Sequence, residues 1–290
     1  MSAASLSTGR RRGVWRGRIF VGLLLLSMAV GFLALGTLCV DVLQRGLAYF
    51  DSVLLTNGPS SDPDIAGARP AILATLYLGV LLILFTVPIG VGTAIYLEEY
   101  ADRHRWHNRL LELNIQNLAA VPSIVYGILG LAFLVRGLGL GRVLFPYTTL
   151  ILTLLVLPTV IIAAREAIRA VPSSIREGAY ALGATQWQVV SRQVLPAAIP
   201  GIATGSILAL ARAIGETAPL ILIGALTFIS FNPTVMGPFT ALPVQIYNWT
   251  KLPDEKFKAL AAAAIIVLLI MVLLLNAGAI WLRNRYQKRW

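Results

Sequence analysis

Six long apolar stretches dominate this sequence and determine the solvent in which the chain folds. A helix that spans a bilayer needs roughly 20 apolar residues, because no water is present there to satisfy its backbone amides and carbonyls. Six segments meet this requirement: Ile19 to Val40, Pro70 to Leu97, Leu113 to Val135, Tyr147 to Ala164, Ala197 to Ile229, and Ala259 to Leu282. The sequence therefore predicts an all-α polytopic membrane protein with six transmembrane helices.

Composition supports a membrane protein and argues against other classes. Hydrophobic residues make up 57% of the chain and charged residues only 13%, far from the balance of a soluble domain. The net charge of +11 comes from short basic clusters between apolar runs, so we expect no nucleic-acid partner. Cys39 is the only cysteine and lies within an apolar run, which excludes an intramolecular disulfide.

Basic clusters also suggest the boundaries and the orientation of the chain. We expect a cytoplasmic basic tail at 1–18, a membrane domain at 19–282 and a second basic tail at 283–290. The first apolar run is 22 residues long, too long for a cleaved signal, and is expected to be a retained span. Alternate connections hold 16 Lys and Arg on one side and 7 on the other, which predicts that both termini are cytoplasmic. Loops at 56–70 and 231–253 would then be external.

The fourth connection, residues 171–196, contains signals for two short helices. Ser174 and Glu177 have the spacing of a capping box, and Thr185 and Gln188 offer a second one. Gly183 lies between them and suits the left-handed residue that ends a helix. We expect two short helices that meet at a sharp bend on the cytoplasmic side.

Apolar residues in this connection recur at roughly helical spacing, namely Ile175, Ala179, Leu182, Trp187 and Val190. Such an edge is suited to the groove of another protein. It equally suits a helix that lies on lipid head groups, helped by nearby arginines. Local physical chemistry leaves both interpretations open.

A family resemblance favours the protein partner. Glu177-Gly178-Ala179, then Gly183, then Leu195-Pro196 is similar to the loop pattern of importer permeases of the ATP-binding-cassette class. In that class the loop is the coupling helix that docks on the ATPase subunit. The resemblance implies this role for nine residues: Ser174, Glu177, Gly178, Ala179, Leu182, Gly183, Trp187, Leu195 and Pro196. Gly178 and Gln193 depart from the pattern, which expects alanine and an aliphatic residue there.

Two charges lie inside the fifth apolar stretch. Arg212 and Glu216 are four residues apart and therefore share one helix face. Charges in a span are costly, by at least ~2.5 kcal/mol each on insertion scales, and usually mark a pathway. One interpretation is an ion pair that only fixes packing. In the other, Arg212 meets a transported oxyanion, Glu216 holds Arg212 in its absence, and Thr217 belongs to the same pathway.

The segment from Arg212 to Pro219 resembles the signature of phosphate importer permeases of the PstA type. Three further segments match the same family: Tyr96 to Tyr100, Val121 to Gly127, and Pro243 to Trp249. The resemblance implies a type I, MetI-like importer fold in the bacterial inner membrane. It also implies a heterodimer with a PstC-like permease, two copies of an ATPase subunit, and an external phosphate-binding protein.

Other polar residues in or near the spans have two interpretations. Ser123 and Tyr126 follow Pro122, where a simple helix kink or a hydroxyl-lined path is expected. Glu98 and Glu99 are expected at the membrane interface or paired with Arg103, because no catalytic partner accompanies them. His104 and His107 are three apart, but a third metal ligand is not evident, so no metal site is expected.

The resulting function is ATP-driven import of inorganic phosphate by alternating access. The chain has no Walker A sequence, so ATP would be bound and hydrolysed by the partner, and we expect no catalytic residues and no cofactor of its own. Two alternatives remain: a permease for another oxyanion such as phosphonate or molybdate, and a passive anion channel.

Overall fold

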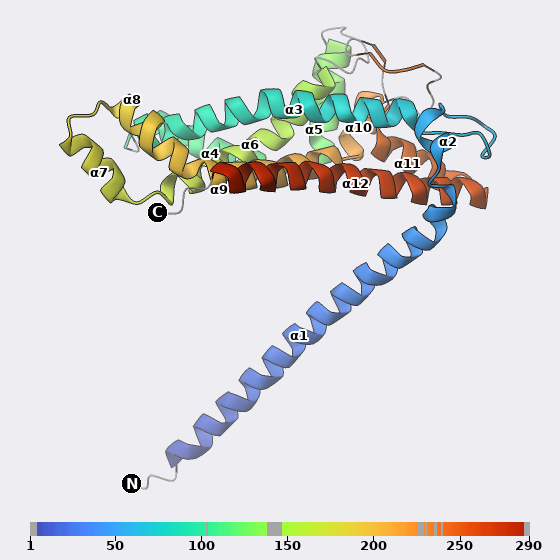
Figure 1. Ribbon diagram of the computed structural model, residues 1–290. Coiled ribbons are helices and arrows are strands. Elements are labelled where there is room, and N and C mark those ends of the chain that lie inside the picture. Colours follow the sequence, from blue (N-terminus) through green and yellow to red (C-terminus); the bar gives the residue numbers. More distant parts are fainter. Residues whose placement is uncertain are drawn as a thin grey trace.

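The computed structural model describes residues 5–102, 104–137, 147–225, 229, 231–234, 237–238 and 240–286, and within them the regular structure is entirely helical (Figure 1). The long helices are α1 (Ser5–Gly46), α3 (Arg69–Ile95), α6 (Thr149–Arg169), α9 (Leu195–Ile214) and α12 (Glu255–Tyr286). Shorter helices are α2 (Ser52–Thr56), α4 (Trp106–Ala120), α5 (Ser123–Leu129), α7 (Ser173–Ala181), α8 (Gln186–Val189), α10 (Ala218–Ile223) and α11 (Leu242–Lys251). The predicted all-α membrane fold is confirmed.

Helix α6 lies at the centre of the bundle, between α3 and α9. Small residues allow α6 and α9 to approach closely: a Cβ atom on Gly201 would lie 2.7 Å from the Cβ of Ala167. Gly205, one turn further along, sits even closer to Ala163. Close backbone approach through small residues is how membrane helices gain packing energy where lipid removes the hydrophobic driving force.

Four of the six predicted spans are continuous helices, and each extends beyond its predicted end. The second span continues from α3 through a π-helical turn at Tyr96–Tyr100. The fourth extends past Ala164 to Arg169, because the charge of Arg165 is matched by carboxylates of neighbouring helices. Pro88 in α3 and Pro158 in α6 lie inside intact helices.

The prediction of one continuous third span was wrong. Residues Trp106–Ala120 and Ser123–Gly137 form two helical segments bent by 102° at the intervening residues. Val121 and Pro122 both have extended backbones, with ψ of 129° and 137°. A proline lacks an amide hydrogen and disfavours the helical region for the residue before it, so the helix ends where the sequence reads Val-Pro.

The fifth predicted span, Ala197 to Ile229, also proved too long. Helix α9 ends at Ile214, and Gly215 to Thr217 separate it from the short α10. Gly224 has a φ of 109° and ends α10 in the left-handed region that glycine adopts without strain. Hydropathy alone did not reveal this break, because apolar residues continue on both sides of it. Residues 226–228 of the prediction lie outside the described residues.

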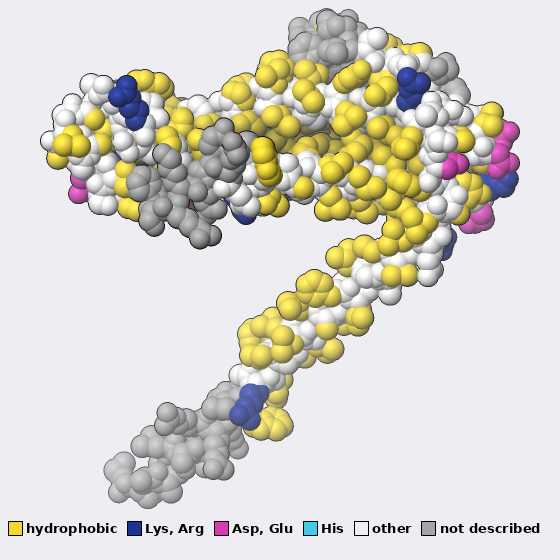
Figure 2. Space-filling view, in the orientation of Figure 1, with side chains coloured by type: hydrophobic (Ala, Val, Ile, Leu, Met, Phe, Trp, Pro, Cys, Tyr) yellow, Lys and Arg dark blue, Asp and Glu magenta, His cyan; other side chains and the backbone are white. Residues whose placement is uncertain are grey.

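Helix α1 departs from the bundle at the end that carries α2 and α11 (Figure 1). Its span is Gly17–Tyr49, and none of its most hydrophobic 18-residue window is buried within the chain. Close to the bundle, a Cβ on Gly46 would lie 2.8 Å from the backbone of Ala262, so α1 and α12 touch there. Figure 2 shows hydrophobic side chains along α1 and over the side of the bundle, the surface expected in lipid.

The two ends of the bundle differ. At one end α3, α6 and α12 finish and α9 begins, and α7 and α8 project there (Figure 1). We call α7 and α8 together the knob. The opposite end carries α2 and α11. Helix α11 was not predicted, because its ten residues are too few to span a membrane and were assigned to an external loop.

Candidate functional site

A small recess lies where the two broken helices interrupt the bundle. Ser123, the first residue of α5, and Arg212, in the last turn of α9, both line it. Its volume is ≈ 30 Å³, room for a few water molecules at most. The other lining residues are Ala119, Val121, Leu155, Val156, Thr159 and Ala209. The structure thus brings together two residues that the sequence assigned to one pathway.

The ion pair between Arg212 and Glu216 is loose. Arg212 Nε lies 3.6 Å from Glu216 Oε1, and the side chains are 75% and 17% exposed. This distance exceeds that of a good charge-assisted hydrogen bond. Because three-quarters of the Arg212 side chain is exposed, its guanidinium stays accessible to other groups. Within this chain the pair is therefore not a tightly packed structural bridge.

The backbone on either side of this pair changes direction. Glycine at 215 follows α9, and Thr217 takes the position before α10, where its hydroxyl donates to the Gly215 carbonyl at 3.5 Å. Helix α10 packs on α5 at Gly127, where a Cβ atom would lie 2.7 Å from Pro219 Cα. The two interruptions are thus joined by close packing between the segments that follow them. Discontinuous helices of this kind line substrate sites in many transporters.

Tyr126 takes a different position from Ser123. It is 8% exposed and packs with Ile151 and Ile223. Its hydroxyl donates to the carbonyl of Leu118, at 2.9 Å, near the end of α4. The same carbonyl also accepts the Val121 amide at 3.2 Å, so the tyrosine ties α5 to the last turn of α4, which is a structural task. The predicted pathway role of Tyr126 stays a prediction, and its geometry gives that role no support.

The knob forms largely as predicted. Gly183 has a φ of +78° and makes the bend between α7 and α8. The Thr185–Gln188 capping box is present: the Thr185 amide donates to Gln188 Oε1 at 2.8 Å, and the Gln188 amide donates to Thr185 Oγ1 at 3.4 Å.

The capping box predicted at Ser174 and Glu177 is wrong. Helix α7 begins one residue earlier, at Ser173, and the residue before it is Pro172, whose side chain makes no capping hydrogen bond. Because Pro172 already holds the extended backbone that precedes the helix, Ser174 falls inside the first turn. Glu177 is exposed on the surface of the knob.

The apolar residues of the knob divide between two faces. Leu182 and Trp187 protrude, with 90% and 64% of their surface exposed. Ile175 and Ala179 are only partly exposed, and Val190, just after α8, is buried. The predicted edge of five residues is therefore narrower, because a two-helix knob must use part of its apolar surface to pack on the bundle. An exposed leucine and tryptophan remain for a partner.

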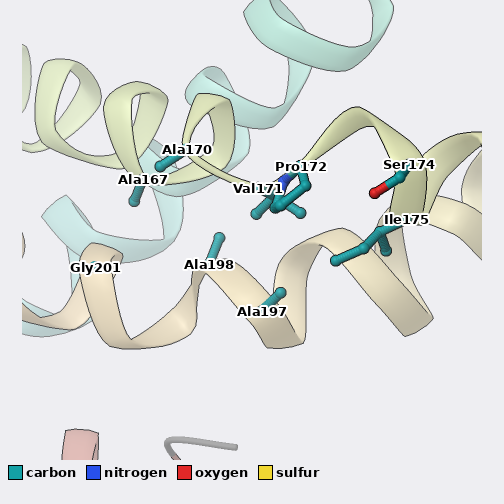
Figure 3. Close-up of a pocket in the computed structure, with 9 residues that line it drawn as sticks. All are labelled: Ala167, Ala170, Val171, Pro172, Ser174, Ile175, Ala197, Ala198 and Gly201. Atoms are coloured by element: carbon teal, nitrogen blue, oxygen red, sulfur yellow. The ribbon is translucent and has the colours of Figure 1, made fainter. Parts of the chain in front are cut away.

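A pocket of ≈ 490 Å³ separates the start of α7 from α6 and α9 (Figure 3). Its nine lining residues are Ala167, Ala170, Val171, Pro172, Ser174, Ile175, Ala197, Ala198 and Gly201. They include no charged side chain, so this pocket offers an anion little beyond the Ser174 hydroxyl. Leu195 and Pro196 begin α9 beside it.

No group of three or more His, Cys, Asp or Glu residues able to hold a metal ion occurs in the described part of the chain. Two candidate functional features stand out among the described residues: the recess with Arg212, and the exposed edge of the knob at one end of the bundle.

The family model described as "Binding-protein-dependent transport system inner membrane component" matches residues 86–290, which include the recess and the knob. The chain belongs to this family. It is a multi-pass permease subunit of an ABC importer, a membrane component without catalytic activity of its own. Permeases of this family pair with ATPase subunits and a periplasmic binding protein.

Two curated relatives resemble this permease over most of its length. It is 30% identical over 263 residues to the "Probable ABC transporter permease protein YqgI" of Bacillus subtilis, which covers 86% of this chain and 88% of the relative. It is 32% identical over 284 residues to the "Phosphate transport system permease protein PstA" of Yersinia pestis, which covers 94% of this chain and 93% of the relative.

Solved transporters share the fold of the permease at low sequence identity. A bacterial alginate ABC transporter in complex with alginate pentasaccharide-bound periplasmic protein matches 96% of this chain and 98% of its own, with a TM-score of 0.67 and 19% identity. The match to the MetNI methionine ABC transporter in an inward-facing conformation covers 77% of this chain and 95% of the transporter chain, with a TM-score of 0.60 and 18% identity. The predicted type I, MetI-like architecture is confirmed.

Proposed function

We propose that this permease translocates inorganic phosphate, as one half of a membrane heterodimer powered by a separate ATPase. The observation that carries the proposal is the exposed guanidinium of Arg212, which lines a recess with Ser123 at the interruption of two membrane helices. A guanidinium offers a planar set of donors that matches a tetrahedral oxyanion. The PstA-named relative supports phosphate among the oxyanions.

The substrate path would form between this chain and a PstC-like partner. The recess in the single chain holds only a few waters, so a phosphate needs a wider opening to which the partner contributes. Arg212 is three-quarters exposed in the isolated subunit and would be costly to leave in lipid. Its exposed face therefore marks the surface that meets the partner. Glu216 would hold Arg212 between transport cycles.

The knob would be the coupling element. Leu182 and Trp187 form an exposed apolar edge at the bundle end where α3, α6 and α12 finish. We place this end, and both termini, in the cytoplasm, where one of two ATPase copies would receive the edge. ATP binding would then move the knob and change which side of the membrane the recess faces. An external phosphate-binding protein would deliver the anion at the α11 end.

Reconstitution tests this function directly. The complex of both permeases, the ATPase and the binding protein is placed in proteoliposomes, and uptake of radiolabelled phosphate is measured with and without ATP. We expect uptake only with ATP and binding protein, and competition by arsenate but not by phosphonate or molybdate. Preferential competition by molybdate or a phosphonate would identify another oxyanion importer. ATP-independent flux would identify a channel.

A further inference from the structure

Two adjacent carboxylates at the end of α3 are almost fully buried. The side chains of Glu98 and Glu99 are 3% and 8% exposed, in the π-helical turn Tyr96–Tyr100. Consecutive residues of a helix point in directions roughly 100° apart, so the two carboxylates reach different partners. Buried charges persist only when they are paired and hydrogen-bonded. Arg103, their predicted partner, lies outside the described residues.

Glu98 joins α3 to α6. Its Oε1 accepts hydrogen bonds from Arg165 Nε at 2.8 Å and from Arg169 Nη2 at 2.7 Å. Arg165 reaches a second carboxylate, that of Glu112 in α4, through Nη2 at 2.7 Å. These contacts connect α3, α6 and α4 through a network whose centre, Glu98 and Arg165, is buried. In such surroundings charge-assisted bonds are strong and hold their geometry.

Glu99 joins α3 to the knob. Its Oε1 accepts hydrogen bonds from Arg176 Nη2 at 2.8 Å and Nε at 3.2 Å. The same guanidinium donates to two main-chain carbonyls at the end of α6, those of Val171 at 2.7 Å and Ile168 at 3.0 Å. Arg176 in α7 is thereby fixed to both α3 and α6 by four hydrogen bonds.

The second helix of the knob is held at the same point. The side-chain amide of Gln186, the first residue of α8, donates to the main-chain carbonyl of Glu99. Beneath these polar contacts, Val189 and Val194 pack in one buried cluster with Ala94 of α3 and Ile168 of α6. Polar and apolar contacts therefore attach both knob helices to the same two membrane helices.

We propose that Glu99 and Arg176 are positioning residues that fasten the knob to α3 and α6, so that the three move as one rigid body when an ATPase displaces the knob. This inference rests on the proposed docking of the knob to the ATPase. The helix breaks after α4 and α9 are where such a displacement would change the backbone, because the run of helical residues is interrupted there, at the extended Val121 and Pro122 after α4 and at Gly215 to Thr217 after α9. The recess with Arg212 lies at these breaks.

A distance measurement tests the rigid body. Spin labels are attached in the assembled complex at Tyr100→Cys, in the last residue of the π turn, and at Ser173→Cys, at the end of α7 distant from Leu182, with Cys39→Ala to remove the native thiol. Tyr100 is 43% exposed and Ser173 is exposed, so labels fit without repacking. We expect the same distance with and without ATP. A distance that changes on ATP binding in this background would overturn the proposal.

Glu99→Gln adds a functional readout. It keeps the size of the side chain but removes the charge that holds Arg176. We expect the label distance to become ATP-dependent and the phosphate transported per ATP hydrolysed to fall at least tenfold, with the ATPase still bound. Arg176→Gln should be at least as severe, because it also loses the bonds to the Val171 and Ile168 carbonyls. The double variant should be no worse than Arg176→Gln alone, because the contact that Glu99→Gln weakens is already lost there. Effects that add, or unchanged coupling in Glu99→Gln, would contradict the fastening role.

Glu255→Gln is the matched control, since Glu255 pairs with Lys258 at the opposite end of the bundle and is 74% exposed. In this variant the amount of phosphate transported per ATP hydrolysed should stay within twofold of the value for the unmodified complex. The distance measurement does not depend on the identity of the transported solute. A complex that keeps the constant distance but imports no phosphate would refute the proposed substrate and leave the rigid body intact.

Discussion

Ser123 and Arg212 line the same recess although they come from opposite halves of the chain, one just after the break between α4 and α5 and the other just before the break between α9 and α10. Each residue lies at an interruption of a membrane helix. Interruptions leave backbone groups without helical partners, which membranes tolerate only where protein or water surrounds them. The shared recess is therefore the natural place for a polar substrate to pass.

Replacing Arg212 with alanine is expected to reduce phosphate uptake by one to two orders of magnitude while the complex still assembles. Loss of charge-assisted hydrogen bonds worth about 1.5–3 kcal/mol corresponds to roughly a 10- to 150-fold drop in the affinity of the transport pathway for phosphate. Radiolabelled uptake by proteoliposomes measures this, with subunit stoichiometry checked by gel filtration. Arg45→Ala is the control, because Arg45 also forms an exposed pair with an acidic residue four positions away, Asp41, but lies far from the recess. Normal uptake by Arg212→Ala would exclude the anion-contact role.

Leu182→Ser is expected to weaken binding of the ATPase without unfolding the permease. The side chain is 90% exposed in the isolated subunit, so its loss should change stability by less than about 0.5 kcal/mol. At the centre of an interface such a residue contributes about 2 kcal/mol, or roughly 30-fold in affinity. Co-purification with the ATPase and a binding titration measure the effect. Ile65→Ser, 55% exposed in the loop before α3, should bind the ATPase normally; equal affinities for both variants would rule out the docking edge.

Gly183→Val is expected to disrupt the bend of the knob. A β-branched residue at a φ of +78° costs at least about 1–2 kcal/mol, and the strain is relieved by moving α8 relative to α7. ATP hydrolysis should then be uncoupled from uptake, or the ATPase should dissociate. Gly58→Val is the control, since it introduces the same residue in the loop after α2, where a Cβ meets no atom within 4 Å and φ is not in the left-handed region. Coupled transport at the normal rate in Gly183→Val would show that the bend is dispensable.

Gly205→Val should destabilise the bundle, because the added atoms would collide with Ala163 across the contact of α6 and α9. Overpacking of this kind costs about 1–3 kcal/mol or more. Thermal unfolding of the purified permease in detergent measures the loss. Gly92→Val in α3 introduces the same residue where nothing lies within 4 Å, and should unfold near the original temperature. If both variants unfold at the same temperature, the close approach of α6 and α9 is not what stabilises the bundle.

Much of the architecture was readable from the sequence, because membrane insertion depends on the local property of sustained hydrophobicity. Four spans and the bend at Gly183 follow from residues that act on their immediate neighbours. The Thr185–Gln188 capping box was also predictable, because it joins two residues only three positions apart. The Ser174–Glu177 box failed because Pro172 set the start of α7 one residue earlier.

The helix breaks and the buried charge network were decided at the tertiary level. The sequence marked Pro122 as a possible kink, but a proline is also compatible with an intact helix, as Pro88 shows. Whether the helix breaks depends on what packs beside it. In the same way, Glu98 and Glu99 gave no local indication that Arg165 and Arg176 would meet them, since partners so distant in sequence are chosen by the packing of α3 against α6.

By itself, then, the sequence determined that this chain folds in a bilayer, where four of its membrane spans lie, and that a pair of short helices forms in one of the connections between spans. The tertiary structure decided which of its polar groups meet: an arginine and a serine at one recess, and a glutamate and an arginine beneath the knob. The physical reason is that hydrophobicity and turn geometry are properties of short segments. Pairing of charges in a desolvated interior depends on the three-dimensional arrangement of the whole bundle.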